Sequence, residues 1–413
     1  MATLVAKAEK IFQDGNCLVK AKDNLYSVAG VIPEEIVEIE ETHPEQKTAT
    51  LIKILEESPY RIQNSCPYYG ICGGCTMRHI NEEYQRKLRC EMLLQMFAKF
   101  AIEIPDFQCH FSNSDGYRCR MQLNSGSLRE RGTNNDIPIQ YCPVATPQIQ
   151  KWLNSTPLES RPFGRTNIFG DIRLQNATEG LCIATENKKN DISYSITGKT
   201  NHKIKNKVKK RYYGTVSSPE NKCTVKISAT GPGNINIQKN ISFDVRGFFQ
   251  SNMTLLEKTI TLILNASSPY FGGKALDIYS GSGTFSTFLG EYFTHITMVE
   301  HNRDALVYAE ENMANYSHES FGLSGTRWAN GNNTKDFQLA LVDPPRSGIE
   351  IDVLHFFSNS KIPAILSLSC NPVTQARDCN RLTKAGYKLK KLHMLDFYPQ
   401  TGHIESLAIL EHI

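Results

Sequence analysis

The chain has 413 residues, of which 40% are hydrophobic and 21% are charged. A chain of this length exceeds a single ordinary core, so two or three domains are expected. Its apolar runs are too short to span a bilayer, and its N-terminus lacks the pattern of a secretory signal, so we expect a cytoplasmic protein with no membrane contact. The net charge of +4 neither indicates nor excludes a polyanionic partner.

The first 58 residues alternate between apolar and polar positions in short stretches. Turn residues at 14–16 and 22–24 separate these stretches. The pattern predicts a small antiparallel barrel of the oligonucleotide-binding type. Its predicted strands are residues 17–21, 25–28, 35–39 and 48–52.

A second, mostly β domain is predicted for residues 59–245. It begins with a cysteine cluster, followed by helical periodicity over residues 82–100, and this helix is expected to pack on the catalytic domain. Residues 117–245 are polar, strand-like and rich in turn residues.

From residue 246 to residue 413, strands alternate with helices. This order is typical of a Rossmann-like α/β domain built on a parallel sheet. We expect strands at residues 275–279, 296–300, 339–343 and 364–369, and a closing antiparallel pair at 388–395 and 406–411.

A glycine loop follows the first of these strands. Gly281 and Gly283 let the backbone approach a ligand, and Glu300 stands nineteen residues after Gly281, where a carboxylate can bind ribose hydroxyls. An ordinary tight turn is the alternative interpretation. Because Ser286 stands where a dinucleotide fingerprint has its third glycine, S-adenosylmethionine is favoured over a dinucleotide.

Two later strand ends carry unusual residues, in the segments 343–348 and 369–372. Ligands of open α/β sheets bind outside the carboxyl ends of the strands, so these segments and the glycine loop are expected to share one crevice. Cys370 would then face the cofactor. A free cysteine is more often a small buried hydrophobe, but Asn371 and Pro372 end the strand and present the thiol at the crevice.

A thiol at a methyl-transfer site has a chemical use if the acceptor is carbon 5 of uracil. Addition of a thiolate at carbon 6 makes carbon 5 nucleophilic, and a base must later remove the carbon 5 proton. Glu405, in a mostly apolar setting, is the best candidate for that base. The alternative is a solvated charge at a strand end.

These segments together resemble the uridine-C5 RNA methyltransferases, which make ribothymidine in transfer and ribosomal RNA. The resemblance covers nearly the whole chain and is strongest in residues 248–252, 277–285, 343–348, 369–372 with 376–378, and 397–405. It implies a class I methyltransferase domain with Cys370 as nucleophile and Glu405 as proton acceptor. The implied cofactor-binding residues are Gln250, Tyr279, Thr284, Glu300, Asn330 and Asp343.

One position departs from the usual motif of this family, and another distinguishes the chain from the cytosine-C5 methyltransferases. Thr284 stands where the family often has asparagine. Arg346 stands where the cytosine-C5 family has its nucleophile, which counts against cytosine as the substrate.

Three thiols fall in one short loop, at Cys66, Cys72 and Cys75, with two glycines that permit a tight path. The resemblance supplies Cys142 as a fourth ligand and implies a [4Fe-4S] cluster. By spacing alone, four cysteines suit zinc equally well. The other cysteines are scattered and are expected to be inert.

RNA is the implied partner, and we expect a monomer. Residues 203–211 carry alternating basic side chains, which suit either phosphate contact or plain solvation. The N-terminal barrel resembles the TRAM domain, although residues 34–57 are acidic. Base extrusion favours a single-stranded loop, in ribosomal RNA by preference or the T-loop of transfer RNA. An inactive iron-sulfur RNA-binding protein is the alternative outside the enzymes.

Overall fold

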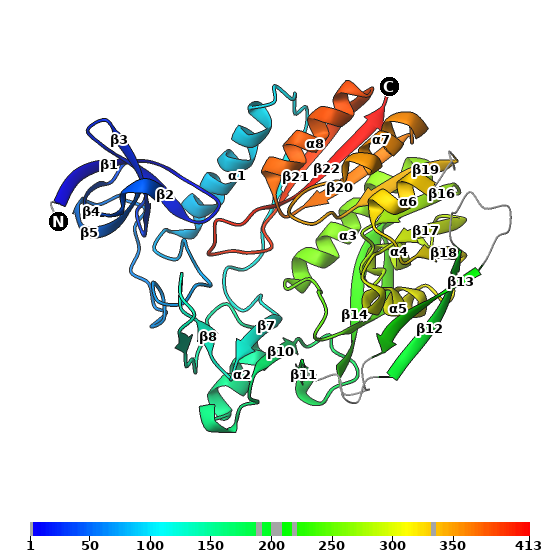
Figure 1. The fold of residues 1–413 in the computed structure, drawn as a ribbon, viewed down its shortest axis with the longest axis horizontal. Coiled ribbons are helices and arrows are strands. Elements are labelled where there is room, and N and C mark those ends of the chain that lie inside the picture. Colours follow the sequence, from blue (N-terminus) through cyan, green and yellow to red (C-terminus); the bar gives the residue numbers. More distant parts are fainter. Residues whose placement is uncertain (1–2, 187–191, 200–208, 217–220, 332–335) are drawn as a thin grey trace.

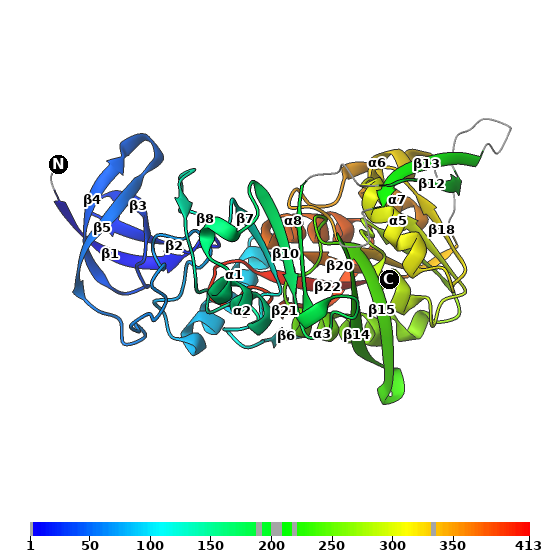
Figure 2. The same cartoon turned by 90° about the horizontal axis from the view of Figure 1, so that it is seen from below.

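The fold is taken from a computed structural model that describes residues 3–186, 192–199, 209–216, 221–331 and 336–413. The N-terminal barrel lies at one end of the longest axis of the molecule and the large α/β part at the other (Figures 1 and 2). Within those ranges, no helix is long and apolar enough to cross a membrane.

The predicted N-terminal barrel is confirmed. Its strands close in the order β1-β2-β3-β5-β4. Alternate side chains point inward, so Ala8, Val19, Val28 and Val37 are fully buried. The strands are β1 (Thr3–Ile11), β2 (Asn16–Ala21), β3 (Asn24–Ala29), β4 (Ile36–His43) and β5 (Thr48–Glu56), of which β1 was not anticipated from the sequence.

The predicted C-terminal α/β sheet is also confirmed, and it has eight strands in the order β18-β17-β16-β19-β20-β22-β21-β6. Neighbours from β18 to β20 pair in parallel, and β22 is antiparallel to both β20 and β21. The strands of the C-terminal domain are β16 (Lys274–Ile278), β17 (His295–Val299), β18 (His318–Phe321), β19 (Phe337–Val342), β20 (Ala364–Ser369), β21 (Tyr387–Leu395) and β22 (Glu405–His412).

Helices cover this sheet (Figure 1). The strands beneath them are buried, as in β20, where every residue is buried. The helices are α3 (Met253–Ser267), α4 (Thr284–Leu289), α5 (Arg303–Asn312), α6 (Gly325–Gly331), α7 (Ile351–Ser360) and α8 (Pro372–Lys384).

Residues 82–110 pack on or join the C-terminal domain although they precede residue 246. The strand β6 (Phe107–His110) pairs in parallel with β21 at the sheet edge. The helix α1 (Glu82–Ala98) contacts α8, and its buried Arg89 bonds the Asp396 carboxylate at 2.9 Å. Segments from both sides of residue 246 therefore build the α/β domain.

The central part contains a three-stranded sheet of β7 (Arg120–Asn124), β10 (Arg165–Gly170) and β11 (Leu181–Thr185), with α2 (Pro147–Ser155) against β10. β8 (Leu128–Arg129) pairs with β9 (Asp136–Ile137). The hairpins of β12 (Ile192–Lys199) with β13 (Lys209–Val216) and of β14 (Lys222–Gly231) with β15 (Ile235–Asp244) also precede residue 246, but they pack on the C-terminal domain, with β13 against α5 and β14 against α3. Of the basic segment 203–211, residues 203–208 lie outside the described residues.

Candidate active site and cysteine pocket

The glycine loop after β16 is shaped by unusual backbone angles. Tyr279 adopts a φ of +67° and Gly283 a φ of +73°. A Cβ on Gly283 would lie 3.1 Å from Ala309, so both backbone angle and space require glycine there. The loop thus turns directly after β16, at the carboxyl end of the strand.

Glu300 holds this loop from the end of the neighbouring strand. Its Oε2 accepts a hydrogen bond from the Gly281 N–H at 2.9 Å, and its Oε1 accepts one from the Asn302 N–H at 2.7 Å. The carboxylate is buried beside the glycine loop, where the sequence had placed it.

Polar groups without protein partners line the same region. Gln250 Oε1 and Ser280 Oγ are buried and have no hydrogen-bond partner in the described part of the chain. Buried polar atoms are normally paired, so these two fit a bound polar ligand. Asp343 follows β19, and burial, then the Glu300 charge, raise its pKa to about 7.

Tyr279 and Thr284 lie on the two sides of the glycine loop. The Tyr279 hydroxyl donates to Glu350 Oε2 at 3.2 Å, and burial raises the tyrosine pKa. Thr284 begins α4, with its hydroxyl 3.4 Å from that of Ser282. Asn330 is exposed in the last turn of α6, whereas Gly325 at the start of that helix is the residue that approaches Tyr279.

Cys370 directly follows β20 and Glu405 begins the neighbouring strand β22, and the charge of Glu405 acts on the Cys370 thiol. The antiparallel register of β20 and β22 ends with Ser369 opposite Ser406, so the next position places Cys370 beside Glu405. Cys370 is half-buried and Glu405 is buried. The sheet thus brings together two residues that are 35 positions apart in the sequence, since 405 − 370 = 35.

The surroundings adjust the acidity of both groups. Burial, followed by the charges of Glu405 and Asp343, raises the pKa of the Cys370 thiol, while Arg346 opposes that shift. Burial and the Asp343 charge raise the pKa of Glu405 to about 8, and a hydrogen bond from Tyr398 opposes it. A carboxyl with a pKa near the working pH suits general acid–base chemistry.

Neither Tyr398 nor Arg346 was assigned a role from the sequence. Asn371 Nδ2 donates to the Arg346 carbonyl at 2.9 Å, which joins the 343–348 and 369–372 segments. Arg346 and Tyr398 touch the reacting pair only in the folded chain, and sequence spacing alone carries no signal for that contact.

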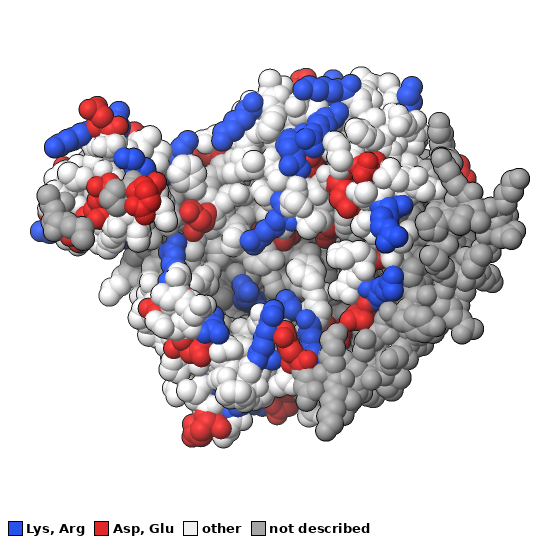
Figure 3. Space-filling model, in the orientation of Figure 1, with Lys and Arg blue, Asp and Glu red and all other residues white. Residues whose placement is uncertain are grey.

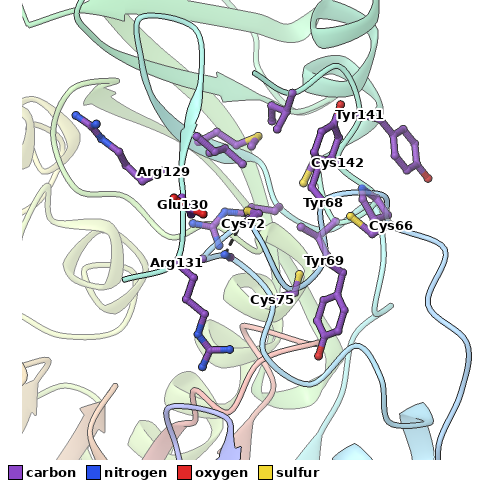
Figure 4. Close-up of a pocket in the computed structure, with 18 of the residues that line it drawn as sticks. Cys66, Tyr68, Tyr69, Cys72, Cys75, Arg129, Glu130, Arg131, Tyr141 and Cys142 are labelled. Atoms are coloured by element: carbon purple, nitrogen blue, oxygen red, sulfur yellow. Dashed lines mark hydrogen bonds between the residues drawn. The ribbon is translucent and has the colours of Figure 1, made fainter. Parts of the chain in front are cut away.

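Four cysteines surround one cavity of about 440 Å³ in the central part. The side chains of Cys66, Cys72, Cys75 and Cys142 face the same space (Figure 4). Burial, then the neighbouring thiols led by Cys142, raise the pKa of Cys75 to about 12. In the described ranges no three His, Cys, Asp or Glu side chains are grouped to hold a single metal ion.

Comparison with known proteins identifies the family. A family profile described as "tRNA (Uracil-5-)-methyltransferase" matches residues 327–413. A protein of Treponema denticola described as "Uncharacterized RNA methyltransferase" is 32% identical over 98% of each chain. The chain belongs to the uracil-C5 RNA methyltransferase family. This methyltransferase uses S-adenosylmethionine to methylate uracil carbon 5 in RNA.

Other members of the family align with the methyltransferase over nearly its whole length. The "23S rRNA (uracil(1939)-C(5))-methyltransferase RlmD" of Psychromonas ingrahamii is 26% identical, covering 98% of this chain and 95% of that one. The Pyrococcus abyssi "tRNA (uracil-54, C5)-methyltransferase", solved with S-adenosyl-L-homocysteine, shares the fold at a TM-score of 0.67 and 20% identity. That alignment covers 98% of this chain and 100% of the other.

The cofactor side of the methyltransferase site is tested by Glu300→Ala. We expect S-adenosylmethionine affinity to fall by up to about 3 kcal/mol, because charge-assisted hydrogen bonds to the ribose and to the glycine loop are lost. RNA affinity should stay close to that of the wild type. Calorimetric titration measures the first and a filter-binding assay the second. Glu319→Ala, on the adjacent strand β18, is the control, and unaltered cofactor affinity in Glu300→Ala would contradict the role of Glu300.

Proposed function

We propose that the protein methylates a specific uridine of the large ribosomal RNA through a covalent adduct with Cys370. The observation that carries the proposal is the placement of Cys370 beside Glu405 at the strand ends that border the glycine loop. Bound S-adenosylmethionine would supply a methyl group on a positively charged sulfur. Gln250, Tyr279, Thr284, Glu300 and Asp343 would hold it, while Asn330 has the weakest structural support.

The residues of the site divide the reaction into two stages. The Cys370 thiolate would form a bond to carbon 6, the electron pair of the carbon 5–carbon 6 double bond would shift to carbon 5, and carbon 5 would take the methyl group as the bond between that group and the cofactor sulfur breaks. Arg346 favours the thiolate by its charge. Glu405 then removes the proton from carbon 5, the double bond re-forms, and the bond between sulfur and carbon 6 breaks.

The uridine must leave its base stack to reach Cys370, so we propose a single-stranded RNA loop as the binding partner. Lys and Arg side chains predominate around the hollow at the centre of the face in Figure 3, whereas the barrel shows both signs of charge. Arg118 lines the cysteine cavity, and its charge also acts on Tyr398 beside Glu405. Phosphate groups of the loop would find cations along this path.

Ribosomal RNA is favoured because relatives described as 23S rRNA methyltransferases align over nearly the whole chain at 26% identity. The T-loop of transfer RNA is the second candidate, since the similar Pyrococcus abyssi structure is a tRNA enzyme. Mapping of 5-methyluridine in both RNAs from a deletion strain tests this choice. Loss of one 5-methyluridine from 23S RNA is expected, and loss from transfer RNA alone would contradict the proposal.

We further propose that Cys66, Cys72, Cys75 and Cys142 hold a [4Fe-4S] cluster. A single zinc ion needs four ligands converging at about 2.3 Å, whereas a four-iron cluster takes one thiolate per iron and needs a wider space. Four cysteines that line one cavity of about 440 Å³ suit the wider group. The cluster would tie the 66–75 loop to Cys142 and so stabilise the central part.

Removal of one ligand tests the cluster. Cys142→Ala, purified without oxygen, should lose most of its iron, since three ligands leave one iron open. Iron and sulfide analysis with visible absorption measures the loss, and the wild type should carry about four irons per chain. Cys119→Ala, at a buried cysteine outside the cavity lining, is the control. Stoichiometric zinc in the wild type, or full iron in Cys142→Ala, would overturn the assignment.

A further inference from the structure

The loop that ends at Glu405 joins β21 to β22 and extends away from the sheet. In Figures 1 and 2 this red segment runs out toward the N-terminal barrel. It has no regular secondary structure over residues 396–404, and Gln400 holds a φ of +68°, a left-handed angle that a residue with a side chain rarely adopts. Glu405 is the first residue of β22 and is paired with Leu395 of β21, so the loop determines how the chain enters that strand, and its contacts help to fix the carboxylate.

Those contacts come from several parts of the chain. Tyr117 donates its hydroxyl to the Pro399 carbonyl at 3.0 Å, and Arg89 of α1 donates to the Thr401 carbonyl at 3.2 Å. The Gln400 carbonyl accepts two backbone hydrogen bonds at 3.0 Å each, one from Thr76 and one from Met77. Thr76 directly follows Cys75 of the cysteine loop.

Thr76 makes a second bond to the same loop. Its Oγ1 accepts a hydrogen bond from the Gly402 N–H at 3.2 Å, while its own N–H reaches the Gln400 carbonyl. Thr76 thus holds the loop at Gly402 and at Gln400, three and five positions before Glu405.

The N-terminal barrel closes this contact from the other side. A Cβ on Gly15, in the β1–β2 turn, would lie 2.2 Å from Thr76 Oγ1, so the turn packs directly on that hydroxyl. A Cβ on Gly402 would lie 2.6 Å from the Gln13 carbonyl oxygen and 2.8 Å from that of Phe12. Arg131 of the central part holds the β1–β2 turn in place, because its Nη2 donates a hydrogen bond to Asn16 Oδ1 at 2.8 Å.

We propose that Thr76 is a positioning residue for Glu405, clamped between the barrel turn and the 396–404 loop. The inference rests on the proposed role of Glu405 as the base. In this proposal the barrel packs its β1–β2 turn against Thr76 and Gly402. That structural role does not require the barrel to bind RNA through charged side chains. Thr76 also links the cysteine loop to the 396–404 loop, because Cys75 and Thr76 are consecutive and Thr76 bonds Gln400 and Gly402.

Thr76→Val and Thr76→Ser separate the hydroxyl from the bulk of the side chain. Both are measured as iron-loaded full-length protein. In Thr76→Val we expect kcat to fall about 10- to 100-fold, the effect of a misplacement of about 1 Å, while KM for S-adenosylmethionine stays unchanged. Methylated RNA–protein complex should accumulate, because proton removal is delayed after the methyl group has been transferred. Thr76→Ser keeps the hydroxyl and should restore turnover.

A second pair of variants tests the barrel contact away from the cysteine loop. Gly15 and Gly30 both lie in barrel turns with left-handed φ values of +79° and +77°, but a Cβ on Gly30 meets only Leu51, at 3.9 Å. Gly15→Ala should therefore accumulate the complex, while Gly30→Ala, which carries the same backbone strain, should turn over normally. This comparison keeps the inference testable if Thr76→Val fails to fold.

Glu405→Gln is measured alongside as the reference for a missing base. If it accumulates the complex and both Thr76→Val and Gly15→Ala turn over like the wild type, the positioning role is wrong and the proposed function stands. Equal loss in Thr76→Ser and Thr76→Val, or in Gly30→Ala and Gly15→Ala, likewise overturns it, since the loss would then be general destabilisation. If Glu405→Gln itself releases product normally, the base assignment fails and this inference fails with it.

Discussion

Cys370→Ala is expected to abolish methylation, with a loss of more than about 10⁴-fold. Carbon 5 of uracil becomes a nucleophile only after a thiolate adds at carbon 6, and Cys370 is the thiol placed beside Glu405 at the ends of β20 and β22. S-adenosylmethionine binding should be retained, because the residues of the glycine loop are unchanged. Transfer of a labelled methyl group to RNA measures activity, and calorimetry measures cofactor binding.

Cys90→Ala is the matched control for this substitution. Cys90 is half-buried like Cys370 but lies on α1, outside the strand ends. Its substitution should leave methyl transfer close to the wild-type rate. Residual methylation in Cys370→Ala at more than a few per cent of wild type would show that another group is the nucleophile.

Glu405→Gln is expected to trap the reaction after methyl transfer. The Cys370 thiolate still adds and carbon 5 still takes the methyl group, but the carbon 5 proton has no positioned base, so the bond from sulfur to carbon 6 cannot break. Loss of a general base costs about 10²- to 10⁴-fold in rate. A methylated RNA–protein complex should therefore survive denaturing electrophoresis, and the double variant with Cys370→Ala should form none.

The pH dependence of product release gives a second measurement of the same role. Because burial and Asp343 raise the pKa of Glu405 to about 8, the carboxyl is mostly protonated below that pH and cannot accept a proton. Product release should slow as pH falls through 8. The positive sulfonium of the bound cofactor lowers the pKa of Glu405 only before methyl transfer, because the charge is lost when the methyl group leaves. Glu405→Gln should lack this dependence, whereas Glu411→Gln, at the far end of β22, should keep it. Identical pH profiles for Glu405→Gln and wild type would exclude the assignment.

The sequence by itself determined the elements with strong local signals. Alternation of apolar and polar positions identified the barrel strands β2 to β5, and buried apolar runs identified β16, β17, β19 and β20. Local motifs also selected part of the site, because glycine spacing, a strand-ending Asn-Pro and the cysteine spacing are each properties of a few consecutive positions. The resemblance to the family added residues whose surroundings carry no such signal, namely Cys142 and the cofactor-binding positions Gln250, Tyr279, Thr284, Asn330 and Asp343.

The tertiary structure decided which of these residues meet. Strand pairing between β20 and β22 puts Cys370 beside Glu405, and the β6–β21 pairing draws residues 107–110 into a sheet that otherwise begins after residue 246. The contact of Thr76 with Gln400 and Gly402 joins positions more than 320 residues apart, since 400 − 76 = 324. Local propensity reports only on neighbours in the chain, whereas these contacts arise from packing between distant segments, and packing is what sets the position of Glu405 and its raised pKa.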